Sequence, residues 1–284
     1  MEDSDLFPEE EGCGKYAEES CSGRLKRGGG FLCLLPRTLS FKDPSETNSK
    51  KASAIVDKLG SLPLAIESSA NRGLGLGLLK AFKEQGYNVF GTVRPQTRSD
   101  PSFKELEATG DTIFDLDYLD EDSITAAAQS YSNNQALDVL INCGGIEMYP
   151  ESWLETTADA LVYKYRVMTV GPFLVRTISQ LTGSAGRHGL AHGIANDSGT
   201  HISYRVPKSA LNALSISIAI ELRAAKENIA VLCVDPGDVP IKLSRWAGDV
   251  NLNDSVRGMY EQIEKATIGD TGLFVNWRGH KWPY

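Results

Sequence analysis

The sequence predicts an α/β fold built on a parallel sheet. From about Leu62 onward, short apolar runs alternate with helical patterns. The first apolar run leads into a glycine-rich turn that opens a helix, and a later run ends at Gly144-Gly145. A repeated strand–helix–strand order needs crossover connections, which join parallel strands. We therefore expect one doubly wound domain whose ligand site lies at the C-terminal ends of the strands.

Each strand is predicted from a short apolar run bounded by glycine or polar residues. These runs span residues 63–67, 88–93, 112–116, 138–142 and 230–234, and a further short strand is expected over 178–181. Each helix is predicted from apolar residues three or four positions apart. These patterns span residues 74–85, 102–108, 122–131, 157–176 and 202–226. Gly86 ends the first helix, and Pro236-Gly237 stops the last strand.

The composition is that of a globular protein. Apolar residues make up 41% of the 284 residues, which is enough for a sizeable core and excludes a wholly disordered chain. The net charge of −8 argues against a general nucleic-acid binder, and no apolar run approaches the ~20 residues that cross a membrane. The acidic start argues against a signal peptide. Five cysteines without paired spacing indicate a reducing, cytoplasmic environment.

Residues 1–60 are predicted to form a mostly disordered extension ahead of a single domain over residues 61–284. The first twenty residues hold most of the net negative charge, and no sustained periodicity follows them before the first strand. One short helix is expected over residues 49–59. Cys13, Cys21 and Cys33 lie in this extension, where we expect free thiols rather than a metal site because no histidine is nearby.

The turn after the first strand has the composition of a phosphate-binding loop. It runs from Ser68 to Gly77 and also contains Gly73 and Gly75. Glycine lets the backbone approach a phosphate, and the helix that follows offers free N–H groups at its N-terminus. The alternative is a packing role, in which Gly75 and Gly77 only let the helix lie close to a strand. The position directly after the first strand favours nucleotide binding.

Two arginines favour NADP over NAD as that nucleotide. An acidic residue at the end of the second strand would hold a ribose diol, whereas arginine favours a 2′-phosphate. The second strand ends at Arg94, and Arg72 lies in the glycine-rich turn. Asp117, just past the third strand, stands where an adenine amino group is read. Any one of these residues alone is equally typical of an ordinary exposed surface.

A tyrosine and a lysine at helical spacing predict acid–base chemistry. Tyr204 and Lys208 lie four positions apart at the start of the longest helical pattern, so both side chains share one face. A nearby cation stabilises the phenolate and lets tyrosine exchange a proton near neutral pH. Of the ten tyrosines, only Tyr204 has a lysine four positions later. A surface pair with the same spacing is the alternative.

Together these motifs resemble those of the short-chain dehydrogenases/reductases, most closely the carbonyl-reductase-like branch that includes the C-factor and sniffer proteins. The likeness begins at about Leu62 and rests on four motifs in the family's order. They are Ala70-Asn71-Arg72-Gly73-Leu74-Gly75, Asn142-Cys143-Gly144-Gly145, Tyr204-Arg205-Val206-Pro207-Lys208 with the following Ser-Ala-Leu-Asn, and Asp235-Pro236-Gly237. The resemblance implies one Rossmann-type domain with a seven-stranded parallel sheet.

The resemblance also implies a role for each matching residue. Tyr204 gives a proton to a carbonyl while NAD(P)H delivers hydride, and Lys208 lowers the pKa of Tyr204 and binds the nicotinamide ribose. The implied contacts to NADP(H), with NAD(H) less favoured, come from Ser69, Asn71, Arg72, Gly73, Leu74, Gly75, Arg94, Asp117, Asn142, Gly144, Lys208, Pro236 and Gly237. The family usually pairs through its two longest helices, so the resemblance allows a homo-oligomer but does not settle the oligomeric state.

Several positions depart from the family's pattern. Ser69 replaces the glycine that opens the loop, which predicts a strained turn or a crowded cofactor. Met168 stands where the family has an asparagine that relays protons through water, and a thioether cannot donate. Pro207 lies between Tyr204 and Lys208, and its ring is tolerated only if the helix begins at about Ile202 or later.

The region of the fifth strand is the weakest match. The family places a serine there to orient the substrate carbonyl. Here the run 176–186 is the candidate strand and strand end, and either Ser184 or Thr182 supplies the hydroxyl, with Ser184 preferred. The histidines of the following loop, His188, His192 and His201, match no metal motif, so no metal is expected.

The sequence therefore predicts a cytoplasmic, NADP(H)-dependent oxidoreductase that reduces a small or medium carbonyl compound or oxidises the alcohol. Its catalytic residues would be Tyr204, Lys208 and Ser184, and its partner a small molecule rather than a nucleic acid or a membrane. The alternative is a degenerate member of the family that binds a nucleotide without turnover. Ser69, Met168 and Pro207 favour that alternative.

Overall fold

A computed structural model of the protein describes residues 64–131, 137–147, 149–150, 152–175, 182–184 and 199–283. It holds an eight-stranded sheet with the order β3-β2-β1-β4-β5-β6-β7-β8. The strands are β1 (Leu64–Ser68), β2 (Asn88–Val93), β3 (Thr112–Asp115), β4 (Val139–Asn142), β5 (Thr182–Ser184), β6 (Leu232–Asp235), β7 (Leu273–Asn276) and β8 (Lys281–Trp282). The extension predicted over residues 1–60 lies outside the described residues.

The strand order confirms the predicted Rossmann-type fold. The first seven strands pair in parallel, and the chain order reverses between β1 and β4, where a crevice for a ligand forms. An eighth strand, β8, pairs antiparallel with β7 through Val275 and Lys281. The seven parallel strands are those that the resemblance implies. Strand β8 is an addition, and its two residues are too few to show a pattern in the sequence.

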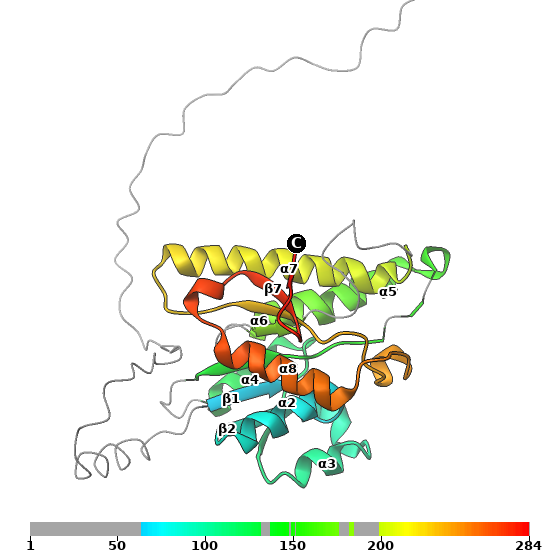
Figure 1. The fold of residues 1–284 in the computed structure, drawn as a ribbon. Coiled ribbons are helices and arrows are strands. Elements are labelled where there is room, and N and C mark those ends of the chain that lie inside the picture. The colour runs from blue at the N-terminus through cyan, green and yellow to red at the C-terminus, as the bar shows by residue number, and fades with distance from the viewer. Residues whose placement is uncertain are drawn as a thin grey trace, which may run out of the picture. The chain divides into compact units, whose positions relative to one another are not determined.

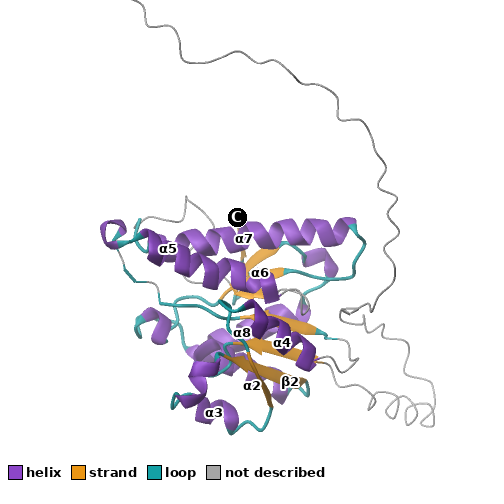
Figure 2. Cartoon of the chain, turned by 180° about the vertical axis from the view of Figure 1, so that it is seen from behind, coloured by secondary structure: helices purple, strands orange, loops and turns teal. Residues whose placement is uncertain are grey.

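Helices cover both faces of the sheet (Figures 1 and 2). The helices are α2 (Gly73–Glu84), α3 (Phe103–Glu107), α4 (Glu121–Tyr131), α5 (Ala158–Tyr165), α6 (Gly171–Val175), α7 (Ile202–Ala224) and α8 (Leu252–Lys265). On one face α2 packs against α8; on the other, α5 packs against α7 and α4 against α6. In Figure 1 the long yellow helix is α7, and the orange helix is α8.

Two apolar layers hold these helices to the sheet. The layer under α2 and α8 contains the fully buried Phe82 and Met259. A Cβ atom on Gly77 of α2 would lie 2.6 Å from Val256 of α8, so Gly77 serves close packing, against a helix rather than a strand. The opposite layer includes Met168 and Tyr204. Burying each such side chain contributes about 1.5–3 kcal/mol, so both layers stabilise the fold substantially.

The structure corrects the prediction of one helix over residues 157–176. Helix α5 ends at Tyr165, a π-helical turn covers Arg166–Val170, and α6 continues from Gly171 to Val175. A π turn bonds residue i to i+5, and apolar spacing does not distinguish it from an α-helix. The strand expected over 178–181 lies outside the described residues, whereas β5 falls inside the candidate run 176–186. The sequence patterns do not predict helix α8 and strand β7, which follow residue 250.

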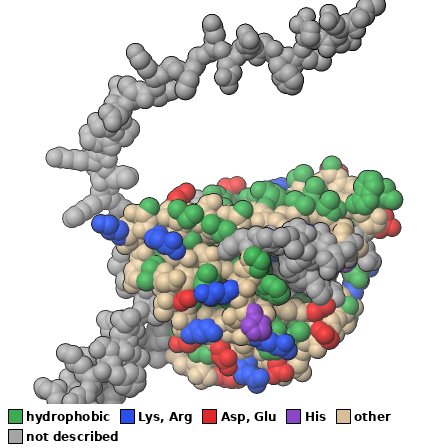
Figure 3. All heavy atoms as spheres, turned by 45° about the horizontal axis from the view of Figure 1, so that its top comes forward, with side chains coloured by type: hydrophobic (Ala, Val, Ile, Leu, Met, Phe, Trp, Pro, Cys, Tyr) green, Lys and Arg blue, Asp and Glu red, His purple; other side chains and the backbone are tan. Residues whose placement is uncertain are grey.

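The outer face of α5 and α7 is apolar. Figure 3 shows hydrophobic side chains gathered over the upper part of the molecule, where these two helices lie. The large exposed ones on α5 are Val162, Tyr163 and Tyr165, and those on α7 are Ile202, Val206 and Ile220. None of the helices in the described part of the chain is long and apolar enough to span a bilayer.

Candidate active site

A cavity of about 920 Å³ opens at the C-terminal ends of the strands. Loops after β1, β4 and β6 contribute to its wall, together with the start of α7. The predicted site residues that line it are Ser69, Asn71, Arg72, Gly73, Leu74, Gly75, Arg94, Asp117, Gly144, Tyr204, Lys208, Pro236 and Gly237. The fold thus brings together residues that lie up to 168 positions apart in the chain, as a binding site at a switch point requires.

Of the predicted residues whose side chains the structure describes, Asn142 does not line this cavity. Asn142 is buried at the end of β4, where its Oδ1 accepts a 3.1 Å hydrogen bond from the hydroxyl of Tyr118. The Nδ2 of Asn142 has no hydrogen-bond partner. Ser184 ends β5 beside Val234 of β6, but its side chain, like that of Thr182, lies outside what the structure describes.

The glycine-rich turn leaves the start of α2 open to the cavity. Gly73 has a φ of +55°, a left-handed conformation that glycine adopts without strain. No side chain caps the helix and no acidic residue lies in its first turn, so its first N–H groups can receive an anion. Ser69 also has a positive φ, +63°, which confirms the strained turn expected from the missing glycine.

Gly144 faces that turn across the cavity. A Cβ atom at this position would lie 2.3 Å from the ring of Tyr118 and 3.0 Å from the hydroxyl oxygen of Ser69. Only glycine therefore fits between these two side chains. The tight contact explains why the loop after β4 needs glycine at Gly144, whichever ligand the cavity holds.

The end of the cavity beside β2 is basic, and one of its arginines lies near an acid that the sequence did not indicate. Arg94 is exposed, and Nη1 of Arg72 lies 3.9 Å from Oδ2 of Asp100. The backbone N–H of Ser102 donates to Oδ1 of Asp100 over 2.8 Å, and this hydrogen bond lowers the pKa of that carboxyl group. Asn71 donates to the hydroxyl of Ser102 over 2.7 Å. Asp100 thus partly balances Arg72, although it does not line the cavity.

Tyr204 and Lys208 lie together at the opposite end. Both are almost completely buried, at 2% and 5% exposure, and Nζ of Lys208 is 5.9 Å from the centre of the Tyr204 ring. Burial lowers the pKa of Lys208 from 10.5 to about 8, while the thiols of Cys143 and Cys233 act in the other direction. The lysine therefore stays mainly cationic at neutral pH. An ammonium group beside a phenol is the arrangement that favours the phenolate.

Helix α7 begins at Ile202, which confirms the condition under which Pro207 is tolerated. Pro207 donates no N–H, yet its own carbonyl accepts a 2.8 Å hydrogen bond from the hydroxyl of Thr169. That bond joins α7 to the π-helical turn. Met168, in the same turn, is fully buried in the apolar layer that contains Tyr204, and it does not line the cavity.

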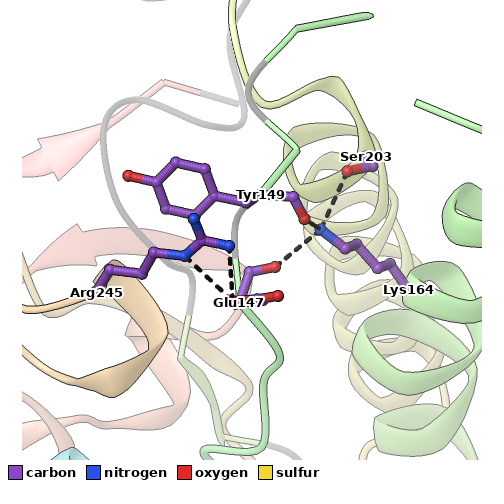
Figure 4. A network of polar contacts seen from close by, with 5 residues as sticks. All are labelled: Glu147, Tyr149, Lys164, Ser203 and Arg245. Carbon is purple, nitrogen blue, oxygen red and sulfur yellow. Dashed lines mark hydrogen bonds and ion pairs between the residues drawn. The ribbon is translucent and has the colours of Figure 1, made fainter. Parts of the chain in front are cut away.

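Sequence reasoning missed the wall of the cavity near Tyr204. This wall includes Glu147, Tyr149, Tyr163, Lys164 and Trp246. Figure 4 shows the contacts between three of its parts: the loop after β4, helix α5 and the N-terminus of α7. One signal was present in the sequence, because Lys164 lies four positions before Met168 and so on the same, inward face of the helical pattern.

No group of three histidine, cysteine or acidic side chains in the described residues could hold a metal ion. His201 lies just before α7, and His188 and His192 are outside the described residues. The described cysteines, Cys143 and Cys233, are not in disulfides.

Comparisons with known proteins agree with this geometry. The family model described as enoyl-(acyl carrier protein) reductase matches residues 69–275, well over half of the chain. The 3-oxoacyl-(acyl-carrier-protein) reductase of Chlamydia trachomatis is 23% identical over 235 residues, which cover 72% of this chain and 88% of the relative.

Two solved structures share the fold. The NADPH-bound carbonyl reductase from chicken fatty liver is 24% identical, with a TM-score of 0.71 over 78% of this chain and 99% of its own. The carbonyl reductase Sniffer of D. melanogaster is 24% identical, with a TM-score of 0.68 over the same shares. With the family match, the parallel sheet and the cavity at its switch point, this chain belongs to the short-chain dehydrogenase/reductase superfamily.

Proposed function

We propose that this protein is an NADP(H)-dependent reductase of a small or medium carbonyl compound, or a dehydrogenase of the corresponding alcohol. One observation carries the proposal: Tyr204 and Lys208 line the same cavity as the glycine-rich turn at the start of α2. A proton donor and an anion-binding helix terminus in one cavity match what hydride transfer to a carbonyl requires. The NADPH bound to the chicken carbonyl reductase supports the choice of cofactor.

The residues present fit such a cofactor. The uncapped first turn of α2 and the left-handed Gly73 would hold its pyrophosphate, and Arg72 and Arg94 its 2′-phosphate. Asp117 would contact the adenine. Thr92 lines the same cavity, and its buried hydroxyl has no hydrogen-bond partner. Pro236 and Gly237 would border the nicotinamide end. When bound, the cofactor would supply the hydride. Residues of the chain would supply the proton and orient the substrate.

The chain's own residues would handle the proton. The hydroxyl of Tyr204 would donate it to the carbonyl oxygen, and the ammonium of Lys208 would stabilise the phenolate that remains. Because Lys208 is buried, water screens its charge little, and its effect on Tyr204 is correspondingly strong. Ser184 or Thr182 would orient the carbonyl from the end of β5.

The test is the loss of reduced-nicotinamide absorbance with a panel of aldehydes, ketones and quinones. Tyr204→Phe should lower turnover by ~10²–10⁴-fold, the usual contribution of a general acid, and leave NADPH affinity nearly intact. Tyr165→Phe, at an exposed tyrosine of α5, is the matched control. Equal turnover by Tyr204→Phe and the parent would place the chemistry elsewhere.

A second candidate is a nucleotide-binding member without turnover. The strained Ser69 and the fully buried Met168, which offers no hydrogen-bond donor at the family's asparagine position, favour it. NADPH would then raise the melting temperature while no carbonyl in the panel is reduced.

We also propose that the protein is cytoplasmic and pairs through the apolar outer face of α5 and α7. The exposed Val162 and Ile220 lie on this face. Glutamate at either position should halve the mass in solution if the pairing exists.

A further inference from the structure

Lys164 is a buried cation that the proposed chemistry does not use. It lies on α5 and is 5% exposed. Its Nζ lies 2.8 Å from the carbonyl oxygen of Glu147, 2.5 Å from that of Tyr149 and 3.1 Å from the hydroxyl oxygen of Ser203 (Figure 4). An ammonium group has three N–H donors and no acceptor. Lys164 therefore uses all three of its donors in hydrogen bonds to two other segments of the chain.

These two segments both border the cavity near the reacting end. Glu147 and Tyr149 belong to the loop after β4, and both line the cavity. Ser203 is fully buried in the first turn of α7, directly before Tyr204. One side chain on α5 thus connects the loop after β4 to the turn that presents the proposed proton donor.

Burying a lysine is unfavourable, and burial lowers the pKa of Lys164. The charge of Glu147 raises this pKa and that of Arg245 lowers it. The three hydrogen bonds offset the lost hydration only while all three acceptors stay in place. The lysine therefore stabilises one particular placement of the loop relative to α7, and other placements leave a buried cation without its partners.

The loop has a second, more exposed attachment. The guanidinium of Arg245 lies 3.8 Å from the centre of the Tyr149 ring, and its Nη2 is 3.3 Å from Oε2 of Glu147. The Tyr149 ring also meets the ring of His201, just before α7, edge to face with 5.4 Å between centres. Exposed contacts of this kind contribute about 1 kcal/mol or less. Lys164, being buried, is the stronger of the two attachments.

We propose that Lys164 is a positioning residue that fixes the loop after β4 against the first turn of α7, so that Tyr204 and the substrate-facing wall keep one geometry. The expected effect of Lys164 on turnover rests on the proposed function. The connection that Lys164 makes between the loop and α7 does not depend on that function. Met168 gives α5 and its π turn no polar side chain at the family's asparagine position. Lys164, one turn earlier, makes a polar contact with α7 through Ser203, in addition to the contact of Thr169 with Pro207.

The decisive variant is Lys164→Met, which keeps most of the aliphatic stem and removes the three donors. Displacement of a reacting group by about 1 Å can cost ~10²-fold in rate, so kcat should fall by about that factor. The Kd of NADPH should stay that of the parent, because the hydrogen bonds of Lys164 go to the loop after β4 and to α7 rather than to the glycine-rich turn. Backbone amides of residues 144–147 and of the first turn of α7 should exchange with solvent faster. Lys80→Met, at an exposed lysine paired with Glu105, is the matched control.

Ser203→Ala is the milder companion variant and serves if Lys164→Met does not fold. It removes one of the three acceptors and should give a smaller change in the same directions, non-additive with Lys164→Met.

A lower melting temperature with unchanged kcat and unchanged exchange would show a purely structural lysine and overturn the proposal. A loss of rate confined to anionic substrates would make Lys164 a substrate-binding residue and overturn it equally. If the parent reduces no carbonyl, the proposed function fails, and amide exchange alone then decides whether Lys164 holds the loop.

Discussion

The indole Nε1 of Trp282 donates a 3.1 Å hydrogen bond to Oδ2 of Asp235. Asp235 is buried at the end of β6, and its Oδ1 accepts a 2.9 Å hydrogen bond from the backbone N–H of Gly237. Strand β8 is thereby connected, through one carboxyl group, to a turn that lines the cavity.

Trp282→Phe should therefore weaken cofactor binding, although Trp282 does not itself line the cavity. Removing one partner of a buried acceptor costs roughly 1–2 kcal/mol, which should appear as a lower free energy of unfolding in urea. The affinity for NADPH should also fall, because the turn at Gly237 loses part of its support. Trp153→Phe, at a tryptophan that is 68% exposed, should change neither quantity.

The cofactor end of the cavity predicts tighter binding of NADPH than of NADH. Charge-assisted hydrogen bonds from Arg72 and Arg94 to a 2′-phosphate are worth on the order of 1.5–3 kcal/mol, a ten- to hundredfold preference. Arg94→Ala should remove most of it, and Arg257→Ala, on the exposed face of α8, should not. Asp100→Asn should increase the preference, because Arg72 then loses a competing carboxylate 3.9 Å away. Equal dissociation constants for the two cofactors in the parent would contradict the assignment.

Met168→Asn should move turnover and stability in opposite directions. An amide at this position restores the hydrogen-bonding side chain of the proton relay that the resemblance implies, so turnover should rise. Met168 is fully buried among apolar side chains, so the amide should also lower the free energy of unfolding by about 1–3 kcal/mol. Met168→Leu, which adds no polar group, should leave turnover unchanged. If the asparagine variant is no faster than the parent, the relay is not what limits the rate.

Lys208 predicts a pH dependence of stability in the protein without cofactor. Its pKa is about 8 in the folded protein and near its ordinary value of 10.5 in the unfolded chain. Between these values the unfolded state holds a proton that the folded state has released, so the free energy of unfolding rises with pH there. Below pH 8 the penalty for burying the ammonium is fully present. Melting temperatures across this range should show the rise in the parent, whereas Lys208→Met should lack it. Turnover should fall above pH 8, as Tyr204 loses its cation.

The folded domain should not need residues 2–55. The described sheet begins at Leu64, and both apolar layers consist of residues from Leu64 onward within the part of the chain that is described. Deleting residues 2–55 should leave the melting temperature unchanged. A large decrease would show that the domain boundary near residue 60 is misplaced.

The features that the sequence predicted are local ones. The turn at Gly73 and the pair Tyr204 and Lys208 are patterns of neighbouring residues, so their positions follow from the strand or helix that contains them. Lys164 and Asp100 escaped prediction because their importance arises from contacts between distant segments. The three partners of Lys164 come from the loop after β4 and from α7, and nothing around residue 164 in the sequence indicates them. The π turn after Tyr165 was missed because its apolar spacing imitates an ordinary helix.

Strand β8 has a consequence for self-association. An unpaired strand at the margin of a sheet offers a row of free N–H and C=O groups to another chain. Here the outer side of β7 is taken by β8, which is two residues long and includes Lys281. The backbone of β8 is too short for a strand of a second molecule to pair with it, and the charged side chain of Lys281 opposes such pairing. Within the described part of the protein, growth into a continuous sheet of several molecules is disfavoured at this margin, and association is left to the surfaces of helices.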